Sequence, residues 1–190
     1  MGRRAEPGRR KAILAVAREL FRKQGYTRTS MEQISIQSGI AHGTIYYYFD
    51  SKLAIVDTLV ENYIDGISDI LVETLSGALG PSQIRNCVHN ILEFASNNPD
   101  VVNLLDIRAA LNLKSFRPAA DAKLHKILSQ VIAEGIQRGR FREYDPAVAA
   151  ALVSGLVEFI TRVCFIFSQY DAPRIEETAV QMLEYALIKN

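Results

Sequence analysis

The sequence predicts an all-α fold of about nine helices joined by short connections. Apolar residues recur at spacings of three and four along most of the 190-residue chain, which is the period of one helix face. No alternation of apolar and polar residues is long enough to indicate a strand. The chain is 48% hydrophobic and 23% charged, a globular composition that excludes a disordered chain, a collagen-like fibre and a disulfide scaffold.

Two helices, the second of them short, are expected at the start of the chain. The first spans residues 9–24, and Gly25 directly after it fits a left-handed carboxyl-terminal cap. The second begins near Thr29 or Ser30, because either residue can form a capping box with the residue three positions on. Gly39 is expected to end it.

A third short helix and a long fourth helix follow. The third spans residues 41–49, and Asp50 or Ser51 can cap the fourth. The fourth helix has a sustained apolar stripe. Its members are Leu53, Val56, Val60, Tyr63, Ile67 and Ile70.

Five more helices are expected, and a proline opens each of them. They begin near Pro81, Pro99, Pro118, Pro146 and Pro173. They reach about Asn97, Leu113, Gly139, Gln169 and Leu187.

Charge divides the chain near residue 52. In total 22 Lys and Arg face 21 Asp and Glu, a formal net charge of +1. Residues 1–52 carry ten of these bases and four of the acids, a net +6, whereas residues 53–190 carry the other twelve and seventeen, a net −5. A basic head on an acidic body suggests phosphate binding at one end, although solvated helix faces would give the same asymmetry. We therefore predict two domains, 1–52 and 53–190.

The segment 29–52 carries the most specific signal. Two short helices joined by a tight turn form a helix-turn-helix pattern, in which the second helix enters the major groove of DNA. The polar and aromatic side chains of that helix can bind base edges or phosphates, and a glycine lets the backbone approach the DNA. The candidate DNA-binding residues are Ser30, His42, Gly43, Thr44, Tyr46, Tyr47 and Lys52.

Two alternatives remain open around this segment. Tyr46 and Tyr47 could pack in the core, but Ile45 and Phe49 already occupy the inner face of the helix, so DNA contact is favoured. The basic residues between positions 3 and 11 could form a solvated arm, or an arm that orders on DNA.

The segment resembles the TetR/AcrR family of transcriptional regulators. The matching residues are Phe21, Gly25, Tyr26, Thr29, Ser30, Met31, Ile34, Gly39, Gly43, Thr44, Ile45, Tyr46, Phe49 and Lys52. The resemblance implies a helix-turn-helix DNA-binding domain of three helices and the start of a fourth, followed by a larger helical ligand-binding and dimerisation domain. The chain departs from the family at Ser35, where a small apolar residue is common, and at Ala41, where a capping residue is common.

The eighth expected helix suggests a second subunit. It is apolar on nearly every side and rich in small residues, so its burial is easiest to complete against another chain. The resemblance implies a homodimer formed through the eighth and ninth helices. Glu158 and Arg162 are four apart and are expected to pair with each other rather than to bind a ligand.

The resemblance also implies a function. We expect a homodimeric repressor that binds a palindromic operator in double-stranded DNA. A small and largely apolar effector would release the repressor from this operator. The candidate effector-binding residues are Phe94, Leu105, Arg108, Asn112, Leu128 and Phe159. The alternatives are an activator of the same fold, or a helical small-molecule-binding protein without specific DNA binding.

Other classes of protein find little support in the sequence. We expect no enzymatic activity, cofactor or metal, although His89 and Glu93 lie four apart and could touch one ligand. Cys87 and Cys164 are far apart in apolar stretches, which favours reduced thiols in a cytoplasmic protein. The most apolar stretch, 147–167, contains two charged residues, so we expect no membrane span.

Overall fold

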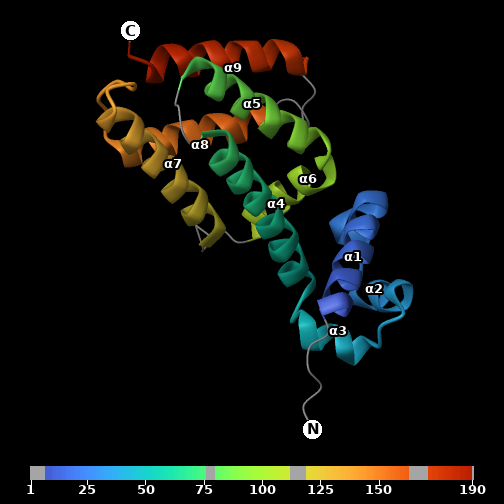
Figure 1. Ribbon diagram of the computed structural model, residues 1–190. Helices are drawn as coiled ribbons and strands as arrows, with labels where there is room; N and C mark the ends of the chain where they lie inside the picture. Colours follow the sequence, from blue (N-terminus) through green and yellow to red (C-terminus); the bar gives the residue numbers. More distant parts are fainter. Residues whose placement is uncertain (1–6, 76–79, 112–118, 163–170, 190) are drawn as a thin grey trace. The chain divides into compact units, whose positions relative to one another are not determined.

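The computed structural model describes residues 7–75, 80–111, 119–162 and 171–189. These residues form nine helices and, apart from one isolated bridge between Phe141 and Ile188, contain no β-structure (Figure 1). The helices are α1 (Pro7–Arg28), α2 (Met31–Ser38), α3 (His42–Tyr48), α4 (Lys52–Leu75), α5 (Pro81–Ser96), α6 (Pro99–Leu111), α7 (Ala119–Gln137), α8 (Pro146–Arg162) and α9 (Ala172–Leu187). The all-α prediction is confirmed.

Side-chain caps decide several helix boundaries. Of the two candidate caps for α2, Ser30 is the one used: its hydroxyl accepts a hydrogen bond from the Gln33 amide, and the Gln33 side chain accepts one from the Ser30 amide. Ser51 caps α4 by accepting a hydrogen bond from the amide of Ala54 at 3.1 Å. Both caps lie within three residues of the groups that they satisfy, and the sequence therefore reveals them.

Helix α1 continues beyond its predicted end. Gly25 has φ 80° and ψ 163°, so it kinks the helix rather than adopting a left-handed cap, and the chain makes one more turn to Arg28. The hydroxyl of Thr29 donates a hydrogen bond to the Gly25 carbonyl at 2.9 Å and closes this turn. The predicted end of the eighth helix, residues 163–169, lies outside the described residues.

The contacts within the chain divide it into two compact units. The first comprises Met1–Asn62 with Asn103–Leu113, and the second comprises Tyr63–Val102 with Lys114–Asn190. Helices α4 and α6 each contribute residues to both units. The domain boundary that the charge pattern suggests, at residue 52, stays a prediction.

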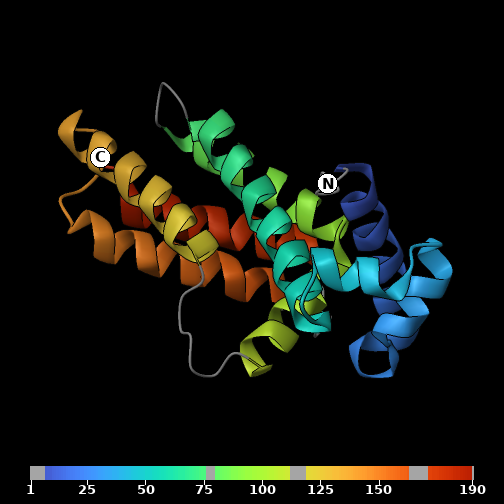
Figure 2. The ribbon, with the colours of Figure 1, turned by 90° about the horizontal axis from the view of Figure 1, so that it is seen from below.

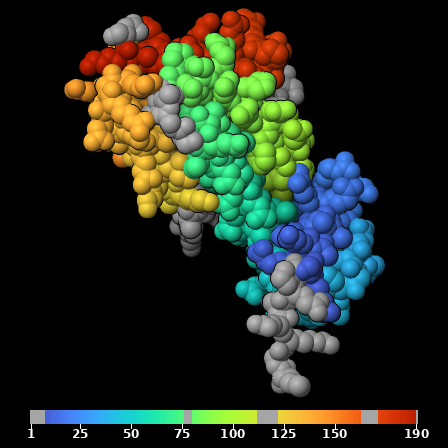
Figure 3. Space-filling model, viewed as in Figure 1, coloured from blue at the N-terminus to red at the C-terminus, as the bar shows by residue number. Residues whose placement is uncertain are grey.

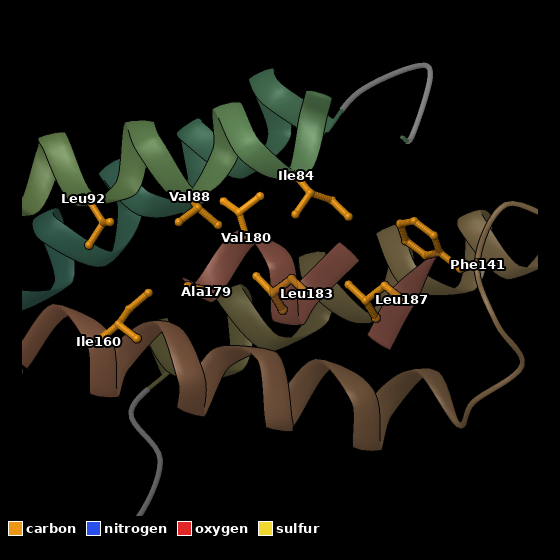
Figure 4. Close-up of a cluster of buried hydrophobic side chains, with 9 residues drawn as sticks. All are labelled: Ile84, Val88, Leu92, Phe141, Ile160, Ala179, Val180, Leu183 and Leu187. Atoms are coloured by element: carbon orange, nitrogen blue, oxygen red, sulfur yellow. The ribbon is translucent and has the colours of Figure 1, made fainter. Parts of the chain in front are cut away.

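The second unit is built around a layered helical core. Helix α7 lies alongside α8 (Figure 2), and α9 packs against α5 (Figure 3). The side chains of α5, α8 and α9 meet those of the connection before α8 in one apolar cluster (Figure 4). Its buried members are Ile84, Val88, Leu92, Phe141, Ile160, Ala179, Val180, Leu183 and Leu187. None of the described helices is both long enough and apolar enough to cross a membrane.

Candidate nucleic-acid interface

Helix α2 is held in place by its caps and by two apolar side chains. Met31 and Ile34 are buried, and the capping box closes the amino-terminal end of the helix. At the other end, Gly39 has φ 65° and ψ 16°, a left-handed conformation that glycine adopts without a steric cost. The predicted end of α2 at Gly39 is therefore confirmed.

Ser35 fastens the turn between α2 and α3. Its hydroxyl donates a hydrogen bond of 2.7 Å to the carbonyl oxygen of Ile40, one residue after the left-handed glycine. A small apolar side chain, which the TetR/AcrR pattern often has at this position, could not make that bond. The polar residue at position 35 thus has a structural explanation.

Helix α3 begins without a side-chain cap. Ala41 occupies the N-cap position and its side chain accepts no hydrogen bond, although its carbonyl oxygen accepts bonds from the amides of Thr44 and Ile45 at 2.7 and 3.1 Å. Ile45 and Phe49 are buried beneath the helix, as the sequence predicts. This inward side orients the opposite side of α3 toward solvent.

The exposed side of α3 carries most of the predicted DNA-binding residues. His42 and Gly43 are exposed, Thr44 is half-buried, and the side chains of Tyr46 and Tyr47 are 43% and 65% exposed. The rings of His42 and Tyr46 pack edge to face with centroids 5.0 Å apart. The helix therefore presents an imidazole, a hydroxyl and two phenols without needing to rearrange its core.

Ser30 and Lys52 lie off this row. The Ser30 hydroxyl is exposed but already accepts the hydrogen bond that caps α2. The Lys52 ammonium is partly buried, and Nζ donates hydrogen bonds to the carbonyl oxygens of Tyr26 and Thr29, each at 2.6 Å. Desolvation in this position lowers the pKa of Lys52.

Two further residues organise the head: Gln24, which the sequence did not single out, and Arg10, one of the basic residues between positions 3 and 11. The Gln24 amide donates to the Gln33 side chain at 3.0 Å and so joins the end of α1 to the capping box of α2. The Arg10 guanidinium donates to the Thr58 hydroxyl at 3.2 Å and lies 5.1 Å from the centroid of the Phe49 ring. Arg10 therefore lies within α1, in the part that the sequence predicts to be helical, and its guanidinium packs against the head rather than extending from it in a basic arm.

Comparison with known proteins agrees with this geometry. The family model described as "Bacterial regulatory proteins, tetR family" matches residues 13–59. The fatty acid metabolism regulator protein of Bacillus subtilis is 25% identical over 177 residues, which cover 90% of this chain and 91% of that protein. A TetR-family transcriptional regulator from Pectobacterium atrosepticum has the same fold, with a TM-score of 0.74 at 23% identity over 98% of this chain and 99% of that one. The chain belongs to the TetR family.

This TetR-family chain is a DNA-binding transcriptional regulator. Its fold also matches that of the fatty acid degradation regulator FadR from Bacillus halodurans, with a TM-score of 0.76 at 19% identity over 95% of this chain and 96% of that one. The family model covers α2 and α3 and the start of α4, which is the part that carries the row of exposed polar and aromatic side chains.

The candidate effector-binding residues of this TetR-family regulator are divided between the two units. Leu105 and the buried Arg108 belong to the first unit, whereas Phe94 and the buried Leu128 belong to the second. Asn112 lies outside the described residues. A pocket of about 460 Å³ in the first unit is lined by other residues, namely Gln24, Gly25, Tyr26, Thr27, Arg28, Ile107, Ala110 and Leu111.

Phe159, the remaining effector candidate, lies on the surface of α8. Its side chain is 63% exposed, and Leu152 on the same helix is 71% exposed. On α9, Met182 and Tyr185 are also largely exposed. In a single chain these side chains leave apolar surface on both helices, which is unusual unless the surface is covered by a partner.

Two pairs of polar side chains and one thiol of the second unit have structural roles. Glu158 and Arg162 form the predicted ion pair at 2.8 Å. His89 lies 3.1 Å from a carboxylate oxygen of Glu176 on α9, so its described partner is not Glu93. Burial raises the pKa of the Cys87 thiol to about 12, which favours the protonated form, and Cys164 lies outside the described residues.

Proposed function

We propose that this regulator is a homodimeric repressor that a small, largely apolar molecule releases from a palindromic operator. The observation that carries the proposal is the exposed row of α3, where the side chains of His42, Tyr46 and Tyr47 are exposed while those of Ile45 and Phe49 are buried. A surface helix with exposed aromatic side chains that carry hydroxyls, set in a helix-turn-helix, is suited to the major groove.

Each chain would read one half of the operator. His42 and Thr44, near the amino terminus of α3, would bind base edges, and the hydroxyls of Tyr46 and Tyr47 would bind phosphates. Ser30, at the amino terminus of α2, would lie near the phosphate backbone. Two heads in a dimer would sit about 34 Å apart, one turn of DNA.

The second chain would pack on α8 and α9. Leu152 and Phe159 are too exposed for core residues of a single chain, and Tyr185 is 80% exposed on α9. Pairing these faces with a second copy would bury apolar side chains at about 25 cal/mol for each Å² removed from water. The partner is another copy of the chain, because the same surface then serves both sides of a two-fold axis.

The effector would bind in the larger helical domain. Two relatives are named for fatty acids: the Bacillus subtilis protein is a fatty acid metabolism regulator, and the Bacillus halodurans structure is of a fatty acid degradation regulator. These names favour a molecule with a long apolar portion for this chain as well. By linkage, such a molecule releases DNA only if it binds the DNA-free form more tightly, by about 1–3 kcal/mol in typical cases.

An activator is the alternative within the same fold, and the position of the operator relative to its promoter decides between the two. The test of effector release uses the DNA duplex that the protein selects from a random-sequence pool. The complex of protein and duplex is titrated with free fatty acids and their thioesters of graded chain length. We expect affinity for DNA to fall by about 5–150-fold for one of these classes. Unchanged affinity at saturating concentrations of a ligand shown calorimetrically to bind would refute the release mechanism.

A further inference from the structure

Lys52 is the first residue of α4, and its ammonium group lies where three helix ends meet. The carbonyl of Tyr26 belongs to the last turn of α1, and the carbonyl of Thr29 directly precedes the N-cap residue of α2. Nζ donates a hydrogen bond of 2.6 Å to each of these two oxygens. One side chain therefore links the beginning of α4 to both sides of the α1–α2 connection.

The Lys52 ammonium is surrounded by protein groups that stabilise a cation. Nζ lies 4.1 Å from the centroid of the Tyr26 ring, within the range of a cation–π contact. Carbonyl groups at the carboxyl-terminal end of a helix carry its negative dipole end, where a cation is stabilised. An ammonium has three donors, and two of them already make short hydrogen bonds. Moving Nζ to a phosphate would leave two helix-end carbonyls without this donor.

Lys52 follows the end of α3 closely in the chain, so its hydrogen bonds to the α1–α2 connection also affect α3. Phe49 caps the carboxyl-terminal end of α3, and only two residues separate it from Lys52. Fixing Lys52 against α1 and α2 therefore also fixes the direction in which α3 leaves the helix-turn-helix. The turn at Gly39 sets the other end of α3.

We propose that Lys52 is a positioning residue of the DNA-binding head, whose ammonium locks the α3–α4 junction to the α1–α2 connection, and that it is not a phosphate contact. The proposal replaces the phosphate role that the sequence suggests for Lys52, and it rests on DNA binding by this head. In this proposal the Lys52 ammonium sets the orientation of α3, the recognition helix, without contacting DNA.

The two roles differ in how binding depends on salt. A lysine that neutralises one phosphate adds about 0.9 to the slope of log affinity against log salt, because it releases a condensed counterion. A lysine whose charge is held by carbonyl groups in both the free and the bound protein adds almost nothing. Loss of a positioning lysine should therefore weaken binding equally at every salt concentration.

The test compares Lys52→Met with Lys11→Met in the full-length chain. Lys11 is exposed on α1, so its replacement removes the same charge from the same unit without touching this network. The probe is the duplex that the wild-type protein selects from a random-sequence pool, titrated over a series of salt concentrations. We expect Lys52→Met to bind about tenfold more weakly than wild type, with a parallel slope. A slope shallower by about 0.9 would overturn the proposal.

A second variant covers the case in which Lys52→Met fails to fold. Lys52→Arg keeps the charge, but a planar guanidinium cannot place one nitrogen between the two carbonyl groups as an ammonium does. A positioning role predicts weaker binding by Lys52→Arg with an unchanged slope. Wild-type affinity in Lys52→Arg would instead support a phosphate contact and overturn the proposal.

A measurement without DNA separates this proposal from the DNA-binding function itself. In the DNA-free wild-type protein, the ammonium hydrogens of Lys52 should exchange with water slowly enough to be seen by NMR, whereas those of Lys11 should not. Exchange as fast as that of Lys11 would overturn the proposal. If no duplex is enriched in the selection, specific DNA binding fails, and the exchange measurement still decides the role of Lys52.

Discussion

The ring of Phe94 on α5 lies directly against the backbone of Gly66 on α4. A Cβ atom added to Gly66 would lie 2.5 Å from Cζ of Phe94 and 3.1 Å from the two ring carbons beside it. The ring of Tyr63, one helical turn before Gly66, also packs on Phe94, with centroids 5.2 Å apart. Because α4 is continuous from Lys52 to Leu75, a displacement of Phe94 would act on the helix that begins in the DNA-binding head.

Gly66→Ala should therefore destabilise the protein. The added methyl group must displace the Phe94 ring, and such overpacking costs about 1–3 kcal/mol of unfolding free energy in denaturant titrations. Gly8→Ala on α1 is the matched control, since nothing lies within 4 Å of a Cβ there. Phe94→Leu should recover part of the loss in the Gly66→Ala background. Equal stability of Gly66→Ala and wild type would show that the contact is not tight.

Tyr46→Phe and Tyr47→Phe should weaken DNA binding without changing stability. Each substitution removes one hydroxyl from the exposed side of α3, and a hydrogen bond to a charged phosphate is worth about 1.5–3 kcal/mol. We expect affinity for the selected duplex to fall about tenfold or more by fluorescence anisotropy, with an unchanged melting temperature. Tyr144→Phe, in the second unit, is the control and should bind like wild type. Wild-type affinity of both α3 variants would show that the hydroxyls of Tyr46 and Tyr47 do not contact the DNA.

Ala41→Ser should stabilise the head. Ala41 is the N-cap of α3 and makes no side-chain cap, whereas a serine hydroxyl there could accept a hydrogen bond from an amide of the first turn. We expect a gain of about 1 kcal/mol in unfolding free energy. Ser30→Ala, which breaks the existing cap of α2, should lose about the same amount. No gain from Ala41→Ser would mean that backbone geometry prevents capping at this position.

Leu152→Asp should give a monomer. Leu152 is exposed on α8 in the single chain, and a carboxylate there would be buried without a partner in a dimer formed through α8 and α9. Sedimentation velocity should show the loss of the dimer, and affinity for a palindromic duplex should fall with it. Val72→Asp, at an exposed apolar position of α4, is the control and should stay dimeric. A dimer that survives Leu152→Asp would place the interface elsewhere.

Features that depend on neighbouring residues were predictable from the sequence. The cap at Ser30, the end of α2 at Gly39 and the inward side of α3 each follow from side chains within a few positions of one another. The ion pair of Glu158 with Arg162 is a relation of the same kind, between residues one helical turn apart.

Features that depend on contacts distant in the sequence were not predictable. Lys52 reaches carbonyl groups 26 and 23 residues earlier in the chain, and no local pattern shows that its ammonium turns inward. His89 lies beside Glu176, 87 residues away, rather than beside its helical neighbour Glu93. Phe159 is a large apolar residue of the kind that lines pockets, but its side chain is exposed on α8. Only the packing of α8 determines which of its side chains are exposed.

Selection from a pool of random-sequence duplexes with the full-length protein tests the central claim most directly. The account predicts enrichment of an inverted repeat whose half-site centres lie about 10 base pairs apart, or a multiple of that spacing. It further predicts that Tyr47→Phe recovers the same sequence with lower yield. A recovered pool that cannot be distinguished from the input, at a salt concentration where the protein is folded and dimeric, would contradict it.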